Sequence, residues 1–168
     1  MQPIKGVRIY EEPEAFAEIS IRGKFLKMSC DLETTLIRIM TLVTPDPLNQ
    51  TRNFKGLTMG NKIEALIADL KKYKNKYYLE YENELNKLWD FKAIRDDMAH
   101  HKMKFDDVQL KSFKVFLIDV QDGKEQLHQK QYTIDFVNEK IIEFINLNVS
   151  FEKLNDKLWN NFKVKNSI

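Results

Sequence analysis

Apolar side chains between Lys24 and Val43 recur at alternating intervals of three and four residues. This spacing places them on one face of an α-helix. Thr44-Pro45 ends the pattern, because a residue that precedes proline avoids the helical conformation. We therefore predict a long amphipathic helix whose core-facing stripe carries Phe25, Met28, Leu32, Thr35, Leu36, Ile39, Leu42 and Val43.

Glycine and proline are scarce, at 5 and 4 of 168 residues, which favours long regular elements over a loop-rich fold. The chain is 43% hydrophobic and 31% charged, a balance typical of a globular protein rather than a disordered one. Its length suits one domain over residues 1–168. The formal net charge of +2 is too small to indicate nucleic-acid binding by itself.

Three features bear on the compartment in which the chain works. It has no run of about 18 apolar residues, so we expect no membrane span. The N-terminal segment M-Q-P-I-K-G-V-R lacks the apolar centre of a signal peptide. Cys30 is the only cysteine, which excludes a disulfide framework and favours a reducing compartment, and its apolar helical surroundings predict a core position. Together these features predict a cytoplasmic protein.

Further helix signals flank the first stripe. Pro13 fits the first position of an earlier helix, and Gly23 is expected to mark a break or a close contact before the next one. Thr58 or Asn61 is expected to cap a helix that carries Ile63, Leu66, Ile67 and Leu70. Another helix is expected from about Glu80, with apolar residues Tyr81, Leu85, Leu88, Trp89, Ile94 and Met98.

The pattern changes after this helix. Residues 113–120, F-K-V-F-L-I-D-V, are rich in β-forming residues. Asp122-Gly123 is a strong turn signal, so Lys124–Thr133 is expected to return as a second strand.

The last helix is expected to start at Thr133 or Asp135, to run to about Asn160 and to bend near residues 146–148. The sequence therefore predicts a mainly all-α fold. It would be a bundle of four to five helices with one small β-hairpin before the last helix.

Within the helix from about Glu80, the segment R-D-D-M-A-H places Arg95, Asp96 and His100 close together in the sequence. Residues four apart lie on one helix face, so Asp96 and His100 are expected to be neighbours. Arg95 lies about 140° from His100 around the helix, but its long side chain can bend to the same edge. Lys102, Lys104 and the turn signal Asp106-Asp107 predict that the helix ends soon after the motif.

These three residue types suit the handling of a phosphate. Histidine transfers protons near neutral pH, a carboxylate can orient its ring, and arginine pairs with phosphate oxygens. The negative end of the helix dipole is expected to favour a protonated His100, as a general acid requires. Adjacent His100 and His101 lack the three- or four-residue spacing of helical metal ligands. We therefore expect no metal site and no cofactor.

R-D-D-M-A-H resembles the R-x4-6-H signature of the HEPN superfamily, in which a polar residue usually follows the arginine and Ala-His often closes the motif. The resemblance implies a helical bundle that forms a homodimer and brings two motifs together. In active members it implies metal-independent RNA cleavage by attack of the 2′-hydroxyl. Lys102 stands where an R-x4-H-x-Y variant has tyrosine, so we infer no nucleotidyltransferase partner.

In that mechanism His100 would be the general acid or base, Arg95 would stabilise the phosphate charge, and Asp96 would orient His100 or hold Arg95. The segment K-K-Y-K-N-K-Y-Y interleaves lysines with tyrosines, which can pair with phosphates and stack on bases. The candidate RNA-binding residues are Lys71, Lys72, Lys74, Lys76, Lys102 and Lys104. The alternative for the segment is a solvated helix end.

Two other functional classes compete with the ribonuclease. One is a non-catalytic module that binds RNA or protein as a scaffold. The other is a toxin, or the neutralising partner of one, in a two-gene defence unit, with an antitoxin or another protein as its partner. RNA cleavage, RNA binding without cleavage, and growth arrest on expression separate the three.

Overall fold

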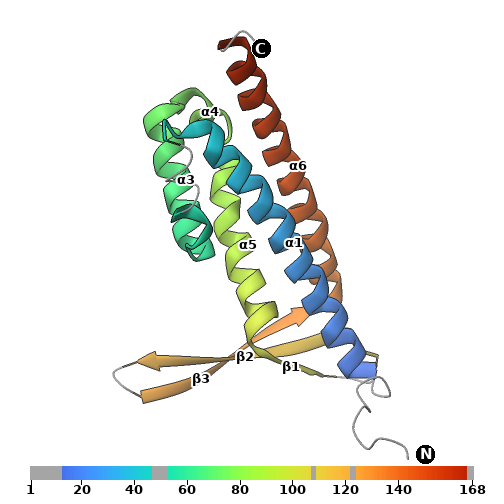
Figure 1. Cartoon of the computed structure of the whole chain (residues 1–168). Coiled ribbons are helices and arrows are strands. Elements are labelled where there is room, and N and C mark those ends of the chain that lie inside the picture. Colours follow the sequence, from blue (N-terminus) through green and yellow to red (C-terminus); the bar gives the residue numbers. More distant parts are fainter. Residues whose placement is uncertain (1–12, 47–52, 107–108, 122–123, 166–168) are drawn as a thin grey trace, which may run out of the picture. The chain divides into compact units, whose positions relative to one another are not determined.

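Helices dominate the structure, a computed structural model that describes residues 13–46, 53–106, 109–121 and 124–165 (Figure 1). The described residues also form one three-stranded antiparallel sheet. The elements run in the order α1 (Pro13–Val43), α3 (Met59–Tyr73), α4 (Asn75–Glu80), α5 (Glu82–His100), β1 (Lys102–Phe105), β2 (Ser112–Gln121), β3 (Lys124–Thr133) and α6 (Ile134–Lys165). Residues 53–55 add one further helical turn.

The chain forms two compact units, each built from segments that are far apart in the sequence. The first unit comprises Met1–Lys27 and Arg95–Ile141, and the second comprises Met28–Ile94 and Ile142–Ile168. Helices α1, α5 and α6 each contribute residues to both units. The R-D-D-M-A-H motif and the sheet belong to the first unit.

The sheet of the first unit has the order β1-β2-β3. Side chains alternate between the two faces of a strand, and Met103, Phe105, Phe113 and Val115 are buried on the inner face. Phe113 stacks on Tyr132 of β3 with ring centroids 5.8 Å apart. This aromatic inner face therefore forms part of the core of the first unit.

All regular elements in the described residues of the second unit are helices. Thr58 caps α3, and its hydroxyl accepts a hydrogen bond from the Asn61 N–H at 3.4 Å. Phe91 of α5 meets Phe144 of α6 edge to face, with ring centroids 5.0 Å apart. A larger set of fully buried side chains, from helices α1, α3, α5 and α6, completes this core: Leu32, Leu36, Ile39, Ile63, Leu66, Leu70, Leu85, Leu88, Phe151 and Leu154.

Several predicted helix boundaries are confirmed. Helix α1 begins at Pro13 and ends immediately before Thr44-Pro45, and α5 ends at His100. The Thr133 hydroxyl accepts a hydrogen bond from the Phe136 N–H at 3.2 Å, so Thr133 caps α6. The hairpin of β2 and β3 is also confirmed, although its turn at residues 122–123 lies outside the described residues.

Other expectations about the helices were wrong. Helix α1 continues through Gly23, and a β-carbon built there would meet no described atom within 4 Å. Gly23 therefore marks neither a break nor a close contact. Helix α6 continues beyond Asn160 to Lys165, and its buried stripe of Phe144, Leu147 and Phe151 keeps the helical spacing through residues 146–148, where the expected bend stays a prediction.

Cys30 is exposed, which corrects the predicted core position. The buried stripe of α1 passes through Phe25, Ser29 and Leu32. One helical step is about 100°, and the step from Ser29 turns Cys30 away from that stripe.

Strand β1 was not predicted from the sequence. This strand follows α5 after a single residue. It pairs with the N-terminal half of β2, from Lys102↔Phe116 to Phe105↔Phe113. None of the helices in the described ranges is long and apolar enough to cross a membrane.

Candidate functional site

Arg95, Asp96 and His100 converge at the C-terminal end of α5. Arg95 Nη1 lies 2.9 Å from Asp96 Oδ1 and 2.9 Å from His100 Nε2. The guanidinium thus reaches both neighbours, as its length allowed. Of the two roles expected for Asp96, the ion pair with Arg95 is the one that these contacts support.

The Arg95–His100 contact involves one of the two nitrogens of the imidazole ring. A guanidinium has donors only, so Nε2 of His100 is the acceptor in this contact. Arg95 therefore covers one ring nitrogen of His100, and the expected protonation of His100 stays a prediction.

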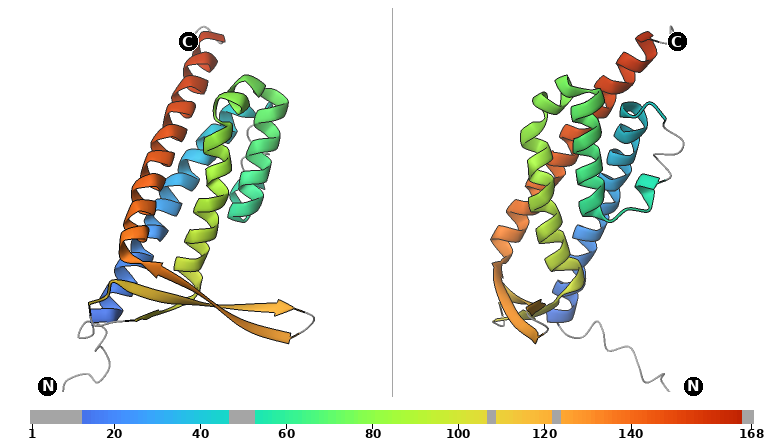
Figure 2. Two further views of the ribbon diagram at one scale, coloured as in Figure 1. Left: turned by 180° about the vertical axis from the view of Figure 1, so that it is seen from behind. Right: turned by 90° about the vertical axis from the view of Figure 1, so that its left-hand side faces the viewer.

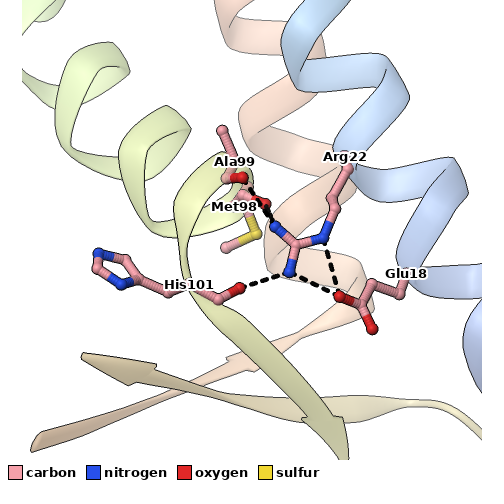
Figure 3. A network of polar contacts seen from close by, with 5 residues as sticks. All are labelled: Glu18, Arg22, Met98, Ala99 and His101. Carbon is pink, nitrogen blue, oxygen red and sulfur yellow. Dashed lines mark hydrogen bonds and ion pairs between the residues drawn. The ribbon is translucent and has the colours of Figure 1, made fainter. Parts of the chain in front are cut away.

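Arg22 of α1 fixes the end of the motif helix (Figure 3). Its Nη1 donates to the carbonyl oxygens of Met98 and Ala99 at 2.8 and 2.9 Å, and its Nη2 donates to that of His101 at 2.5 Å. The last carbonyls of a helix have no partner within the helix, and Arg22 supplies it. Glu18 holds the guanidinium, with Oε1 at 2.6 Å from Nη2 and 2.9 Å from Nε.

Asp97 connects the motif helix to the sheet. Its side chain is buried, and Oδ2 accepts hydrogen bonds from Lys130 Nζ at 2.8 Å and Tyr132 Oη at 2.6 Å, both on β3. Burial, together with this bond to the carboxylate, raises the pKa of the Tyr132 hydroxyl above its ordinary value. Asp97 therefore holds the last turn of α5 against β3.

The Asp97–Tyr132 bond predicts a stability that depends on alkaline pH. The pKa of Tyr132 is higher in the folded chain than in the unfolded chain, so its contribution is complete below about pH 10 and is lost as the pH rises further. Tyr132→Phe should lower the free energy of unfolding by about 1.5–3 kcal/mol at neutral pH. In urea unfolding, the difference between wild type and variant should shrink above about pH 10. A difference that stays constant up to pH 11 would contradict this account.

The contacts that Arg22 and Asp97 make at the site were not predicted from the sequence. The only feature of the sequence that distinguished Arg22 was its residue type. Arginine is rare in this lysine-rich chain, with 5 Arg residues among 27 basic ones. Asp97 is the second member of an Asp-Asp pair, and its role depends on a strand 33 residues later in the chain. No local spacing rule predicts either contact.

Arg95 has one unsatisfied donor. Its Nε is buried and has no hydrogen-bond partner among the described residues. A buried donor without a partner costs about 1–3 kcal/mol, and such atoms are rare in native proteins.

An open hollow of about 430 Å³ adjoins the motif. It is lined by His100, His101, Lys102, Phe116, Ile118 and Leu127, all from the first unit. Its volume lies in the range of about 300–1,000 Å³ typical of small-ligand sites. His100 is therefore both a member of the motif and part of a concave surface.

The six candidate RNA-binding lysines fall into two groups. Lys102 and Lys104 are exposed on β1, in the unit that holds the motif. Lys71, Lys72, Lys74 and Lys76 lie in the second unit, around the junction of α3 and α4.

Two of the second group contact tyrosines of their own segment. Lys71 Nζ lies 4.6 Å from the centre of the Tyr78 ring, and Lys72 Nζ lies 4.7 Å from that of Tyr73. These local contacts favour the solvated helix end over an RNA-binding role for Lys71 and Lys72.

Within the described ranges, no group of three or more His, Cys, Asp or Glu side chains is arranged to hold a metal ion. No protein-family model matches this chain, and neither a curated protein nor a solved structure is significantly similar to it.

Proposed function

We propose that this chain is a HEPN-like endoribonuclease that works as a homodimer and uses side chains alone for catalysis. The observation that carries the proposal is the contact of Arg95 with both Asp96 and His100 at the end of α5. A mainly helical fold with a small sheet after the motif helix is compatible with this class.

The chemistry begins with attack of a ribose 2′-hydroxyl on the adjacent phosphorus. A base takes the hydroxyl proton, the bond from phosphorus to the 5′-oxygen breaks, and an acid protonates that oxygen. The products are a 2′,3′-cyclic phosphate and a 5′-hydroxyl. One imidazole cannot take up and deliver the two protons at the same moment, so two copies of His100, one from each subunit, divide the tasks.

Arg95 links substrate binding to proton transfer. In the structure its guanidinium occupies Nε2 of His100, the nitrogen that would accept the proton. A phosphate attracts the guanidinium more strongly than a neutral ring does, because that hydrogen bond is charge-assisted on both sides. Substrate would therefore draw Arg95 toward the phosphate and free Nε2 to act as the base.

Cleavage of single-stranded RNA in the presence of EDTA tests this proposal. The wild-type protein should cut the RNA and leave 2′,3′-cyclic phosphate and 5′-hydroxyl ends, which phosphatase and kinase treatment distinguish. RNA that stays intact under conditions in which the protein binds it would contradict the proposal.

The second candidate is a non-catalytic module that binds RNA or protein. The hydrogen bond between Arg95 and His100 favours it, because a trio closed on itself also describes an ordinary polar cluster at a helix end. Such a module would bind RNA equally well with and without His100, and it would leave the RNA uncut.

We further propose a cytoplasmic role in defence, with the ribonuclease as the toxin of a toxin–antitoxin pair. Its partner would then be an antitoxin that blocks the motif. Expression of the wild-type chain alone should arrest growth, and Arg95→Ala should relieve the arrest. Unimpaired growth at high expression of an RNA-cleaving wild-type chain would contradict the toxin assignment and leave the nuclease assignment intact.

Asp96 supplies a test of the dimer. Two copies of Arg95 near one two-fold axis repel each other, and the Asp96 carboxylate at 2.9 Å offsets that charge in each subunit. Asp96→Ala should weaken the dimer by roughly 5- to 30-fold, from about 0.5–1 kcal/mol for each of two partly exposed pairs. Sedimentation equilibrium measures this constant.

The matched control is Asp156→Ala, which removes an exposed carboxylate from α6. This control should leave the dimer constant unchanged. A dimer that is equally stable with Asp96 replaced would show that the motif does not lie at the two-fold axis.

A further inference from the structure

The face of the sheet opposite the buried aromatic residues is both basic and apolar. The register places Lys102, Lys104, Lys114, Phe116, Ile118 and Leu127 on this outer sheet face. Ile118 and Leu127 are directly paired across β2 and β3, and they are 65% and 68% exposed. Such large exposed apolar side chains on a sheet indicate a binding surface.

The lysines of this face are arranged unfavourably for stability alone. Lys104 and Lys114 stand directly opposite each other on β1 and β2, and like charges in that position are destabilising. Asp106 lies 3.7 Å from Lys114 and offsets part of the repulsion. Lys102, the third lysine, is paired with Phe116. An anion bound along β1 would relieve the repulsion.

The outer sheet face is continuous with the motif. Lys102, Phe116, Ile118 and Leu127 line the same hollow as His100. Beyond Phe116, which pairs with the first residue of β1, strands β2 and β3 continue as a two-stranded ribbon from Leu117↔His128 to Gln121↔Lys124 (Figure 2). A chain bound at His100 would therefore meet the hollow first and the lysines of β1 next to it.

We propose that the outer sheet face binds the single-stranded RNA that flanks the cleaved phosphate. One nucleobase occupies the hollow against Phe116, and the neighbouring phosphates lie along Lys102, Lys104 and Lys114. The combination of lysines with an aromatic side chain is what single-stranded nucleic acid requires, because cations pair with phosphates and rings stack on bases. The inference rests on the proposed ribonuclease function and adds to it a substrate class and a binding path.

Binding is measured separately from cleavage in the full chain carrying His100→Ala. A fluorescein-labelled, mixed-sequence single-stranded RNA is titrated in EDTA at several salt concentrations. Lys104→Ala/Lys114→Ala should flatten the dependence of log K on log salt by about 1.4, since each single-strand phosphate contact contributes about 0.7. Phe116→Ala should weaken binding roughly 5- to 100-fold, as expected for the loss of one stacked base, and leave the salt dependence unchanged.

Matched controls remove the same groups from other elements. Lys153→Ala/Lys163→Ala removes two charges from α6, and Phe16→Ala removes an exposed ring from α1. These variants should bind like the parent. Leu127→Ala, at a more exposed position of the hollow, should also weaken binding and provides a readout if Phe116→Ala does not fold.

The sheet variants would overturn the inference if they bound RNA as the controls do. A sheet variant whose sedimenting mass changes while its RNA affinity does not would also overturn it and would assign the face to contact with a second copy of this chain. Cleavage by the wild-type chain is scored independently. RNA cutting with unaffected binding in the sheet variants would refute only the binding path, whereas the predicted binding losses without any cutting would refute only the nuclease.

Discussion

Replacement of His100 by alanine should reduce RNA cleavage by about 10²–10⁴-fold, the usual contribution of a general acid or base. In the proposed dimer both copies lose their proton carrier in this variant, so the upper part of that range is expected. The fold should be unaffected, because His100 is exposed at the end of α5 and its side chain contact is with Arg95. Single-turnover cleavage of labelled RNA in EDTA measures the loss.

His128→Ala is the matched control for this experiment. His128 is an exposed histidine on β3, in the same unit as the motif. Its replacement should leave the cleavage rate within about two-fold of wild type, since surface substitutions away from a site have small effects. Equal rates for His100→Ala and wild type would remove His100 from the mechanism.

Arg22→Met should destabilise the chain and slow cleavage together. The variant keeps an apolar stem, but it leaves the carbonyls of Met98, Ala99 and His101 without their donor. Each lost bond to a charged group costs about 1.5–3 kcal/mol when no replacement exists. Water can reach this partly exposed site, so a total loss of about 3 kcal/mol in urea unfolding is expected.

The effect on cleavage follows from the position of these carbonyls. They immediately precede and follow His100, so a frayed helix end displaces the imidazole. The turnover number should fall at least about ten-fold, because small displacements of a catalytic group are costly. Arg38→Met, at an exposed position of α1, is the control and should change neither quantity. A stable Arg22→Met protein with normal turnover would show that the hydrogen bonds from Arg22 to these carbonyls do not position His100.

Much of the fold was predictable because its signals are local. Pro13 and Thr44-Pro45 define both ends of α1, Thr58 and Thr133 cap α3 and α6, and the hairpin strands end on either side of the Asp122-Gly123 signal. Each of these signals acts through the conformational limits of one or two residues or through one short hydrogen bond. They do not depend on the tertiary structure.

The errors have a common physical cause, which is tertiary context. Gly23 has a low helix propensity, but the cost of about 1 kcal/mol is tolerated within a helix of 31 residues. Strand β1 is only 4 residues long, and it exists because β2 offers it an edge. The exposure of Cys30 could be predicted only from the exact position of the buried stripe on α1, and the apolar residues around Cys30 did not define that position.

The residues of the candidate site were predictable from the sequence, but the residues that hold them in place were not. Spacing along α5 predicted that Arg95, Asp96 and His100 lie together, because helical geometry alone decides it. Arg22 and Asp97 act across distances of 76 and 33 residues in the sequence, respectively. Only the folded chain brings those partners together.

Two subunits are proposed to share one catalytic site, and a mixed dimer tests this arrangement most directly. Wild-type chains and Arg95→Ala/His100→Ala chains carrying different tags are co-expressed, and the mixed dimer is isolated through both tags. The shared site predicts that this dimer cleaves RNA as slowly as the dimer of two double-variant chains. Cleavage at half the wild-type rate would mean that each subunit works alone, and it would contradict the account.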